Sequence, residues 1–284
     1  MRSRVIVMLI CCLVFADFAI CQSQDSKYNY QMPVNQSTLL GVGKVSMLDS
    51  YLSPLVYDGI SFSLLHERMR NFYWRDTNML LQSQFVMHLG STKNPTSTSS
   101  EYRGNVEWGI NGYYPIVDEQ KFRLYVGGGP EASLGGIYNV RNSNNPGSLK
   151  TYINVNAGAL AMYNWKKITF RWQVSTPFVG MVFSPGYGHS YYEIFTLGND
   201  KGTLHIASFG SQLAFRNYVT ADIPVDKVTF RIGYLCDIYR TNLSKIETKI
   251  NTHEFVIGLA FETLNFGGKR DIEKSKLNSS LYRY

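Results

Sequence analysis

The sequence predicts an all-β protein: a transmembrane, antiparallel, up-and-down β-barrel of about ten strands, within a range of about 8 to 12. Three observations predict it. Aromatic residues make up 14% of the 284 residues and accompany 24 glycines, a composition typical of β-rich chains. Apolar and polar residues alternate along most of the chain. Short connections alternate with longer polar ones, as in barrels of the outer membrane.

The composition excludes several classes of protein. The chain is 44% hydrophobic and 17% charged, which is too apolar for a disordered protein. After residue 21 no apolar run approaches the length of a membrane-spanning helix. The net charge is +7, but the Lys and Arg residues are interspersed with acids and form no basic stripe. Nucleic-acid binding is therefore not indicated, and anionic lipid headgroups fit the charge better.

Residues 1–21 are predicted to be a cleaved signal peptide. Arg2 and Arg4 precede an apolar run from residue 5 to residue 15, and Ala19 lies two residues before the predicted cleavage after Cys21. The run is too short for a membrane anchor, and lipidation of Cys21 would require a small residue where Ile20 stands. The expected location is the cell outer membrane.

The remaining chain is expected to form one domain. Residues 22–37 are polar and are predicted to be a flexible lead-in, residues 38–266 the barrel, and residues 267–284 a periplasmic tail. Three of the four cysteines lie within the predicted signal peptide, so Cys236 has no partner for an internal disulfide. Closure of the barrel would provide the stability that disulfides give to other exported proteins.

Strands are predicted from the two-residue period. Between residues 168 and 174, for example, Ile, Phe, Trp and Val alternate with Thr, Arg and Gln. Most runs exceed the roughly 5–6 residues of an average globular strand and match tilted strands that cross a bilayer. The predicted strands are 38–49, 55–68, 78–91, 101–115, 121–138, 150–164, 167–183, 203–219, 226–241 and 248–265.

Alternation alone does not show which face points inward, so a soluble β-sandwich or lipocalin-like barrel is the competing fold. The membrane fold is favoured because one face is rich in polar residues suited to a packed lumen, and because aromatic residues gather near strand ends as interfacial girdles do. The expected lipid-facing residues include Trp108, Phe170, Trp172, Phe230, Ile232 and Phe255. The girdles are expected to include Trp74, Tyr113, Tyr114, Tyr163, Trp165 and Tyr218 at one end and Tyr57, Tyr138, Tyr191, Tyr192 and Tyr239 at the other.

The polar face is expected to form a luminal network of ion pairs and hydrogen bonds. Charges of both signs recur on it, and about ten strands leave little open space, since eight-stranded barrels are filled and roughly sixteen strands are needed for an aqueous channel. The predicted members are Glu67, Arg103, Glu107, Arg123, Glu131, Arg171, Arg216, Arg231, Asp237 and Glu254.

Certain segments resemble a known group of proteins. Residues 51–55, read as Tyr-Leu-Ser-Pro-Leu, are followed by Tyr57 and Gly59, and Glu-Trp-Gly stands at 107–109. With the predicted mature start at Gln22, they resemble a family of uncharacterised outer-membrane β-barrel proteins of Bacteroidetes-type bacteria. The resemblance implies a location and a fold, and it carries no catalytic residues.

Catalytic and metal sites are weakly indicated. His189 and Ser190, with His205 nearby, fall in or beside the longest loop, where some outer-membrane barrels carry hydrolytic residues. No histidine pair has the spacing of a helical zinc site, and His88 is interpreted as a satisfied polar residue of the wall rather than a ligand. No cofactor or metal is expected, and the glycines at 127–129 are interpreted as bends in a strand.

The leading hypothesis for the function is a structural or binding role carried by the extracellular loops, with the lumen largely filled. The alternatives are a narrow channel for small solutes and a hydrolase at the rim. The expected partners are the lipid bilayer and an unidentified protein or small molecule.

Overall fold

The computed structural model describes residues 33–74, 77–225 and 228–264. The predicted signal peptide at 1–21 and the tail at 267–284 lie outside these residues. The first described residues belong to a strand, so the lead-in predicted for 22–37 extends too far. Its last part, from Pro33 onward, pairs with the end of the chain's final strand.

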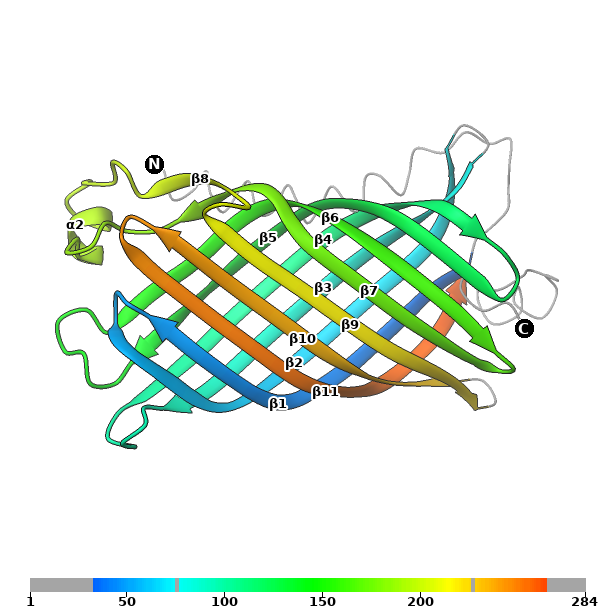
Figure 1. Cartoon of the computed structure of the whole chain (residues 1–284), viewed down its shortest axis with the longest axis horizontal. Helices are drawn as coiled ribbons and strands as arrows, with labels where there is room; N and C mark the ends of the chain where they lie inside the picture. Colours follow the sequence, from blue (N-terminus) through cyan, green and yellow to red (C-terminus); the bar gives the residue numbers. More distant parts are fainter. Residues whose placement is uncertain (1–32, 75–76, 226–227, 265–284) are drawn as a thin grey trace. The chain divides into compact units, whose positions relative to one another are not determined.

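Eleven strands and one short helix make up the described residues (Figure 1). No helix among them is long and apolar enough to cross a membrane. The strands are β1 (Pro33–Asp49), β2 (Ser53–Trp74), β3 (Thr77–Lys93), β4 (Ser100–Asp118), β5 (Phe122–Asn139), β6 (Gly147–Trp165), β7 (Ile168–Phe183), β8 (Leu204–Ser208), β9 (Gln212–Val225), β10 (Val228–Leu243) and β11 (Ile246–Leu264), with helix α2 at Tyr191–Phe195.

Ten of the strands close into an antiparallel barrel, which confirms the predicted fold class. Neighbours in the chain pair with each other, except that β7 pairs with β9 across the short β8. The ring closes between β1 and β11, in a register that runs from Pro33 opposite Leu264 to Asp49 opposite Thr248. Closure leaves no exposed edge in the wall, because every wall strand has a partner on both sides.

The strand predicted for 203–219 is wrong, because it is two strands, β8 and β9, separated by residues 209–211. Their partner β7 explains the break. It pairs with β9 up to Ser175 and with β8 from Val179 onward, and Pro177 lies between these stretches at a register irregularity opposite β6. Proline has no N–H to donate, so the ladder is interrupted at this point.

The connections gather at two ends of the barrel. Residues 75–76, 119–121, 166–167 and 226–227 join strands at what we call the short-turn end. Residues 50–52, 94–99, 140–146, 184–203 and 244–245 join them at the long-loop end. The connection predicted for 242–247 is only two residues long. Ser244 and Lys245 have φ values of 51° and 65°, as a tight hairpin turn with two left-handed residues requires.

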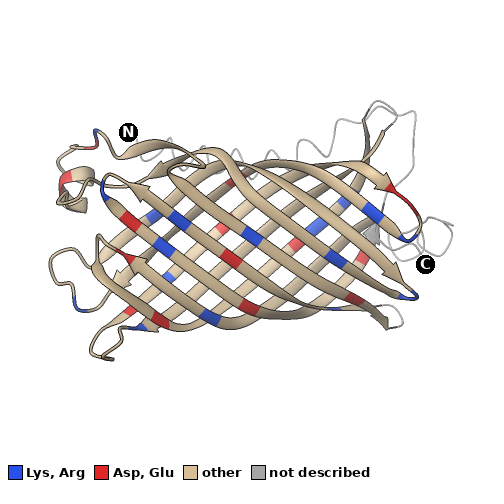
Figure 2. Ribbon diagram, viewed as in Figure 1, with Lys and Arg blue, Asp and Glu red and all other residues tan. Residues whose placement is uncertain are grey.

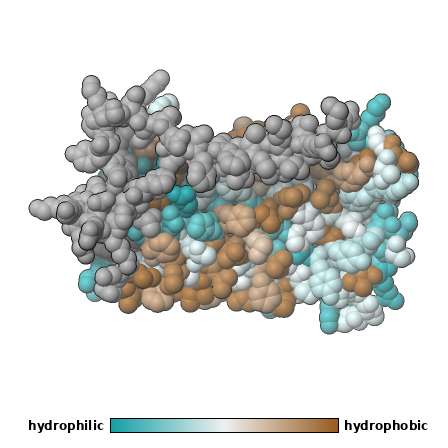
Figure 3. All heavy atoms as spheres, turned by 180° about the vertical axis from the view of Figure 1, so that it is seen from behind, coloured by the Kyte–Doolittle hydropathy of each residue, from teal (hydrophilic) through white to brown (hydrophobic). Residues whose placement is uncertain are grey.

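Apolar side chains cover the outside of the wall. Figure 3 shows them gathered over the middle of the visible face, with paler and more polar atoms towards the long-loop end. Of the residues expected to face lipid, Phe170, Trp172, Phe230 and Phe255 are exposed, and Trp108 and Ile232 are partly covered by neighbours on the same face. This exterior is the surface that a bilayer would cover.

Part of the predicted aromatic girdle is wrong. Tyr57, Tyr113, Tyr218 and Tyr239 are buried inside the barrel, whereas Trp74, Tyr114, Tyr138, Tyr163 and Trp165 are exposed on the outside. Strand parity explains the difference, because consecutive residues point to opposite faces. Tyr113 shares the inward phase of Asn111, and its neighbour Tyr114 points out.

We predict that Ile257→Arg will destabilise the protein in a phospholipid bilayer. Ile257 is 50% exposed on the outer face of β11, between Phe255 and Leu259. A charge at the midplane of the bilayer costs about 2–4 kcal/mol. Equilibrium refolding into vesicles measures this loss, and Val140→Arg, which changes an exposed apolar side chain in a loop at the long-loop end, is the control. Equal stability of the two variants would contradict a membrane-facing wall.

Candidate functional site

The interior of the barrel carries the charged residues that were predicted for the lumen. Figure 2 shows charges of both signs distributed along the strands. The structure brings most of these residues together in two groups, which we call the lower cluster, nearer the short-turn end, and the upper cluster, nearer the long-loop end. The ten predicted residues have side chains that are buried or nearly so: Glu67, Arg103, Glu107, Arg123, Glu131, Arg171, Arg216, Arg231, Asp237 and Glu254.

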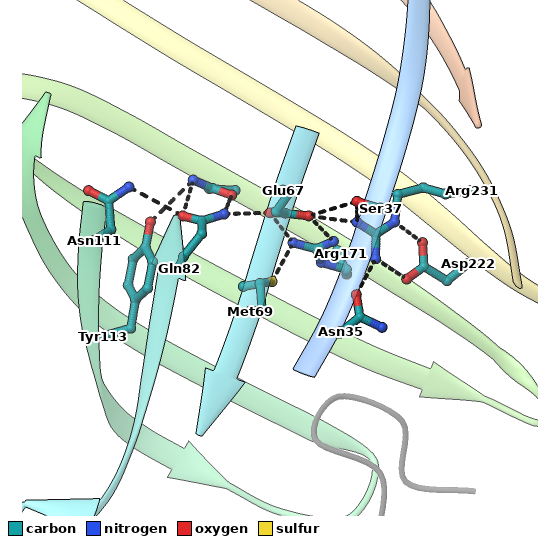
Figure 4. Close-up of polar contacts among 11 residues, drawn as sticks. Asn35, Ser37, Glu67, Met69, Gln82, Asn111, Tyr113, Arg171, Asp222 and Arg231 are labelled. Carbon is teal, nitrogen blue, oxygen red and sulfur yellow. Dashed lines mark hydrogen bonds and ion pairs between the residues drawn. The ribbon is translucent and has the colours of Figure 1, made fainter. Parts of the chain in front are cut away.

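The lower cluster is organised around the carboxylate of Glu67 on β2 (Figure 4). Arg171 from β7 donates to both of its oxygens, at 2.9 Å each. Arg231 from β10 donates to Oε2 at 2.6 Å and forms a second, two-pronged pair with Asp222 at 2.7 and 2.8 Å. Bidentate guanidinium–carboxylate pairs fix orientation as well as distance.

Neutral side chains extend this cluster across the lumen. Ser37 accepts from Arg231 at 2.7 Å, and Gln82 donates to Glu67. Gln82 and Gln173 also exchange hydrogen bonds, of 2.8 and 3.1 Å, and Gln173 donates to the hydroxyl of Tyr113. The charges are thus enclosed by donors and acceptors from several strands, which buried ionic groups require.

Sequence reasoning missed Asp222, which lies in a segment predicted to be the connection 220–225. The strand in fact continues to Val225, and Asp222 has the same parity as Arg216 and Thr220, which also face inward. Continuing the two-residue period past Tyr218 would have found it. Two acids, Glu67 and Asp222, balance two guanidinium groups, Arg171 and Arg231, in this cluster.

An apolar layer separates the two clusters. It consists of Leu39, Leu65, Val86, Tyr218, Leu235 and Val256, which pack together inside the barrel. On β2, Leu65 lies between Ser63 of the upper cluster and Glu67 of the lower one. On β10, Leu235 lies between Arg231 and Asp237, although its apolar character had marked it as an exception on the polar face. The lumen is therefore layered rather than uniformly polar.

The upper cluster is organised around Arg216 on β9. Its guanidinium donates to Glu107 on β4, to Asp237 on β10 at 2.7 Å and to Glu131 on β5 at 3.4 Å. Glu107 also accepts from Asn105 at 2.6 Å and from the hydroxyl of Tyr152 at 3.2 Å. One cation thus joins three carboxylates from different strands.

The remaining predicted residues differ in their surroundings. Glu254 accepts from Ser61 and Ser63 at 2.5 Å each, and Arg103 donates to Thr252 at 3.3 Å. Arg123 is among the largest fully buried side chains, near the short-turn end of β5.

His88 on β3 belongs to the same region and is fully buried. Its Nε2 lies 3.6 Å from Asp237 Oδ2, and its Nδ1 lies 4.0 Å from Glu254 Oε1. Both distances exceed that of a hydrogen bond. Neither ring nitrogen has a hydrogen-bond partner among the residues that the structure describes. The sequence interpretation of a satisfied wall residue is therefore wrong in this respect.

A small cavity opens beside the upper cluster. Glu107, Glu131, Arg216 and Asp237 contribute to its lining, and its volume is about 40 Å³. A water molecule needs roughly 10–15 Å³ measured in this way, so the cavity has room for about three. That is far below the several hundred Å³ of a ligand pocket.

The residues singled out as catalytic candidates have structural roles at the rim. Ser190 Oγ accepts from the backbone N–H of Glu193 at 3.2 Å, and Glu193 accepts from the N–H of Ser190, which forms a capping box at the start of α2. His205 Nε2 lies 3.0 Å from Ser244 Oγ and 3.3 Å from the carbonyl of Ser184. Among the described contacts, no hydrogen bond joins Ser190 to His189 or His205, so the expected nucleophile and base are not paired.

The sequence matches a family model over residues 6–270, and the model is described as a protein of unknown function, DUF3316. The chain belongs to this family. No curated protein matches the sequence. The family match agrees with the expectation of an uncharacterised family, whereas the Bacteroidetes origin stays a prediction.

Solved outer-membrane barrels share the general architecture. The outer-membrane protease OmpT from Escherichia coli is 9% identical, with a TM-score of 0.49, over 85% of this chain and 99% of that one. The β-domain of the Bordetella autotransporter BrkA is 10% identical, with a TM-score of 0.40, over 81% and 99%. An outer-membrane channel from Pseudomonas putida F1 is 8% identical, with a TM-score of 0.37, over 85% and 100%. Likenesses at these identities concern the fold and carry no activity over to this chain.

We predict that Glu67→Gln will destabilise the barrel strongly. The substitution removes the one acid that pairs with both Arg171 and Arg231, and it leaves a buried positive charge without full compensation. Breaking a buried pair in this way costs about 3–5 kcal/mol. Urea unfolding of the refolded protein measures the change. Glu119→Gln, in an exposed short turn, is the control and should leave stability unchanged; a small loss for Glu67→Gln would show that water compensates the two guanidinium groups.

We predict that Ser190→Ala will loosen helix α2. The side chain caps the first turn, and loss of a Ser cap costs about 1 kcal/mol. Hydrogen–deuterium exchange should accelerate across residues 191–195 and stay unchanged in the barrel wall. Ser143→Ala, in an exposed loop, is the matched control. Unchanged exchange at 191–195 would leave the cap without a structural role and revive the serine as a catalytic candidate.

Proposed function

We propose that the protein is an outer-membrane barrel with a closed interior, which binds a partner through its long-loop end. The observation that carries this proposal is the filled lumen. Two ionic clusters and the apolar layer between them cross the interior, and the cavity beside the upper cluster holds only a few water-sized molecules. Such an interior gives no continuous aqueous path of the kind found in porins.

The long-loop end is also closed by an apolar group of side chains. Val45, Met47, Ile137, Tyr152, Val182 and Tyr239, among others, pack together inside the barrel near this end. A further polar tier lies above them, where Lys150 pairs with Asp49 at 2.9 Å and Asn139 donates to Glu101 at 2.9 Å. The end where solutes would enter is therefore packed as well.

Residues 184–203, which we call the cap segment, lie across this mouth. The hydroxyl of Tyr51, in the turn between β1 and β2, donates to the carbonyl of His189 at 2.8 Å. The hydroxyl of Tyr191 accepts from the N–H of Leu149 on β6 at 2.6 Å, and the rings of Tyr51 and Tyr191 pack edge to face at 5.6 Å. Because β1 and β6 lie far apart around the ring, these contacts hold the segment over the opening.

The anchoring hydroxyl stays protonated over a wide pH range. Burial, together with the neighbouring Tyr191, Asp49 and Glu193, raises the pKa of Tyr51 to about 12. The donor to His189 is thus present at any pH compatible with the outer membrane. The closed mouth does not depend on pH through this contact.

Exposed apolar side chains on the cap segment support a binding role. Tyr187, Tyr192, Phe195 and Leu197 are each about two-thirds exposed. Clustered apolar residues on an exposed loop mark interaction sites more often than inert surface. The cap segment therefore offers an aromatic surface to a protein or small molecule outside the cell.

We predict that the refolded protein will not conduct ions in planar lipid bilayers. The packed interior leaves no path for hydrated ions, so no discrete current steps should follow insertion. An open porin added to the same bilayer is the control, and a heat-modifiability gel confirms that the barrel is folded. Reproducible steps at low voltage would contradict the closed interior and favour the narrow channel.

A variant that lacks residues 186–202 tests the binding part of the proposal. It should refold into a heat-modifiable barrel, because the wall strands pair independently of the cap segment. In nanodiscs it should bind less of an environment-sensitive apolar dye than the full chain does. Equal dye binding would place the apolar surface elsewhere.

A further inference from the structure

His88 is a buried imidazole that lacks the contacts such a group needs. It is 0% exposed, and neither nitrogen has a hydrogen-bond partner within the described chain. Leaving a buried polar group without a partner costs about 1–3 kcal/mol. The ring nevertheless faces carboxylates from two other strands, Asp237 on β10 and Glu254 on β11. This combination suggests a partner that is neither a protein donor nor a protein acceptor.

The atoms around the ring have the spacing of a metal site. One ligand atom from each of His88, Glu107 and Asp237 lies within 4.8 Å of the other two. Zinc holds nitrogen and oxygen ligands at about 2.0 Å in a tetrahedron, which places the ligand atoms about 3.3 Å apart. The 3.6 Å between His88 Nε2 and Asp237 Oδ2 is close to that edge. Small side-chain shifts would bring three strands to one ion.

The local charge also calls for a cation. In the upper cluster the four acids Glu107, Glu131, Asp237 and Glu254 face two guanidinium groups, Arg103 and Arg216. Two negative charges are therefore uncompensated when His88 is neutral. A single divalent ion would balance them. The lower cluster, with two acids and two guanidinium groups, shows no such excess.

We propose that His88, Glu107 and Asp237 bind one divalent transition-metal ion of the zinc class inside the barrel. His88 Nε2 is the nitrogen ligand, and its Nδ1–H points to Glu254, as in the carboxylate–histidine–metal arrangement that orients many ligating imidazoles. Each carboxylate has two oxygens and about four lone-pair sites. Glu107 and Asp237 can therefore bind the ion and Arg216 together.

The neighbouring cavity completes the site. Glu107 and Asp237 line it, so a water molecule there can occupy the remaining coordination position. The site is independent of the proposed binding role at the long-loop end. Its effect would be to join β3, β4 and β10 across the lumen.

Cobalt(II) tests the proposal, because its visible absorption reports the coordination number. The full chain is refolded in the presence of EDTA, transferred to chelator-free detergent and titrated with Co²⁺. We expect about one equivalent to bind, with the intense bands of a four- or five-coordinate ion, and Zn²⁺ to displace it. Because the site is enclosed, a parallel sample is refolded with the metal present and analysed for bound metal after desalting.

Two ligand variants locate the site. His88→Gln and Asp237→Asn should each weaken Co²⁺ binding by at least about tenfold, a loss that even the substitution of outer partners can cause. His253→Gln is the matched control, because His253 lies on the outer wall and bonds to Tyr234 at 2.6 Å. A heat-modifiability gel shows which variants fold. Unchanged binding in folded His88→Gln or Asp237→Asn would overturn the assignment.

The wild-type chain decides the matter even if both variants fail to fold. Zn²⁺ should raise the thermal midpoint of the EDTA-treated protein, because a ligand that binds only the folded state stabilises it, and Mg²⁺ should not. Failure of the wild type to bind Co²⁺, or a weak six-coordinate spectrum, would overturn the proposal. His88 would then be a protonated residue that balances part of the acidic excess.

Discussion

The paired ends of Arg231 and Glu67 determine how the interior of the barrel is built. Arg231 on β10 binds Asp222 on β9, Ser37 on β1 and Glu67 on β2, and Glu67 in turn binds Arg171 on β7. A closed wall forces every inward side chain to find its partner across the lumen, since no solvent-exposed edge is available. Charges that cannot leave must be compensated within a few ångströms, which fixes the inward phase of five strands together.

This constraint explains what the sequence could predict. The alternation of apolar and polar residues gave the strands, their approximate number and the inward face, because one-residue slips would turn Glu67 or Arg171 towards lipid. It could not give the partners. Which acid meets which guanidinium depends on the shear of the barrel, and Arg231 meets Glu67 although they are 164 residues apart in the chain. The break between β8 and β9 depends likewise on Pro177 of the neighbouring strand.

The layered interior shows a limit of reading polarity as position. Leu39, Leu65 and Leu235 are apolar and face inward, while Tyr113 and Tyr218 carry polar groups inside a barrel where aromatic residues were expected on the outside. In a wide barrel the lumen would be wet and such residues would be unfavourable. In a ten-stranded barrel the facing walls are close enough for side chains to touch, so an apolar layer can be buried there as in a soluble core. Strand parity, rather than the type of side chain, decides which face a residue occupies.

The division between the clusters has a physical consequence for function. Below the apolar layer of Leu65 and Val86, acids and guanidinium groups balance and pair in bidentate geometry, which makes a rigid plug. Above it, acids outnumber cations, a small cavity remains, and His88 lies among carboxylates without a hydrogen bond to any described residue. Stability alone would favour compensation in both halves. The imbalance is confined to the half that opens towards the cap segment, so that half of the barrel is where a function beyond holding the wall together is to be sought.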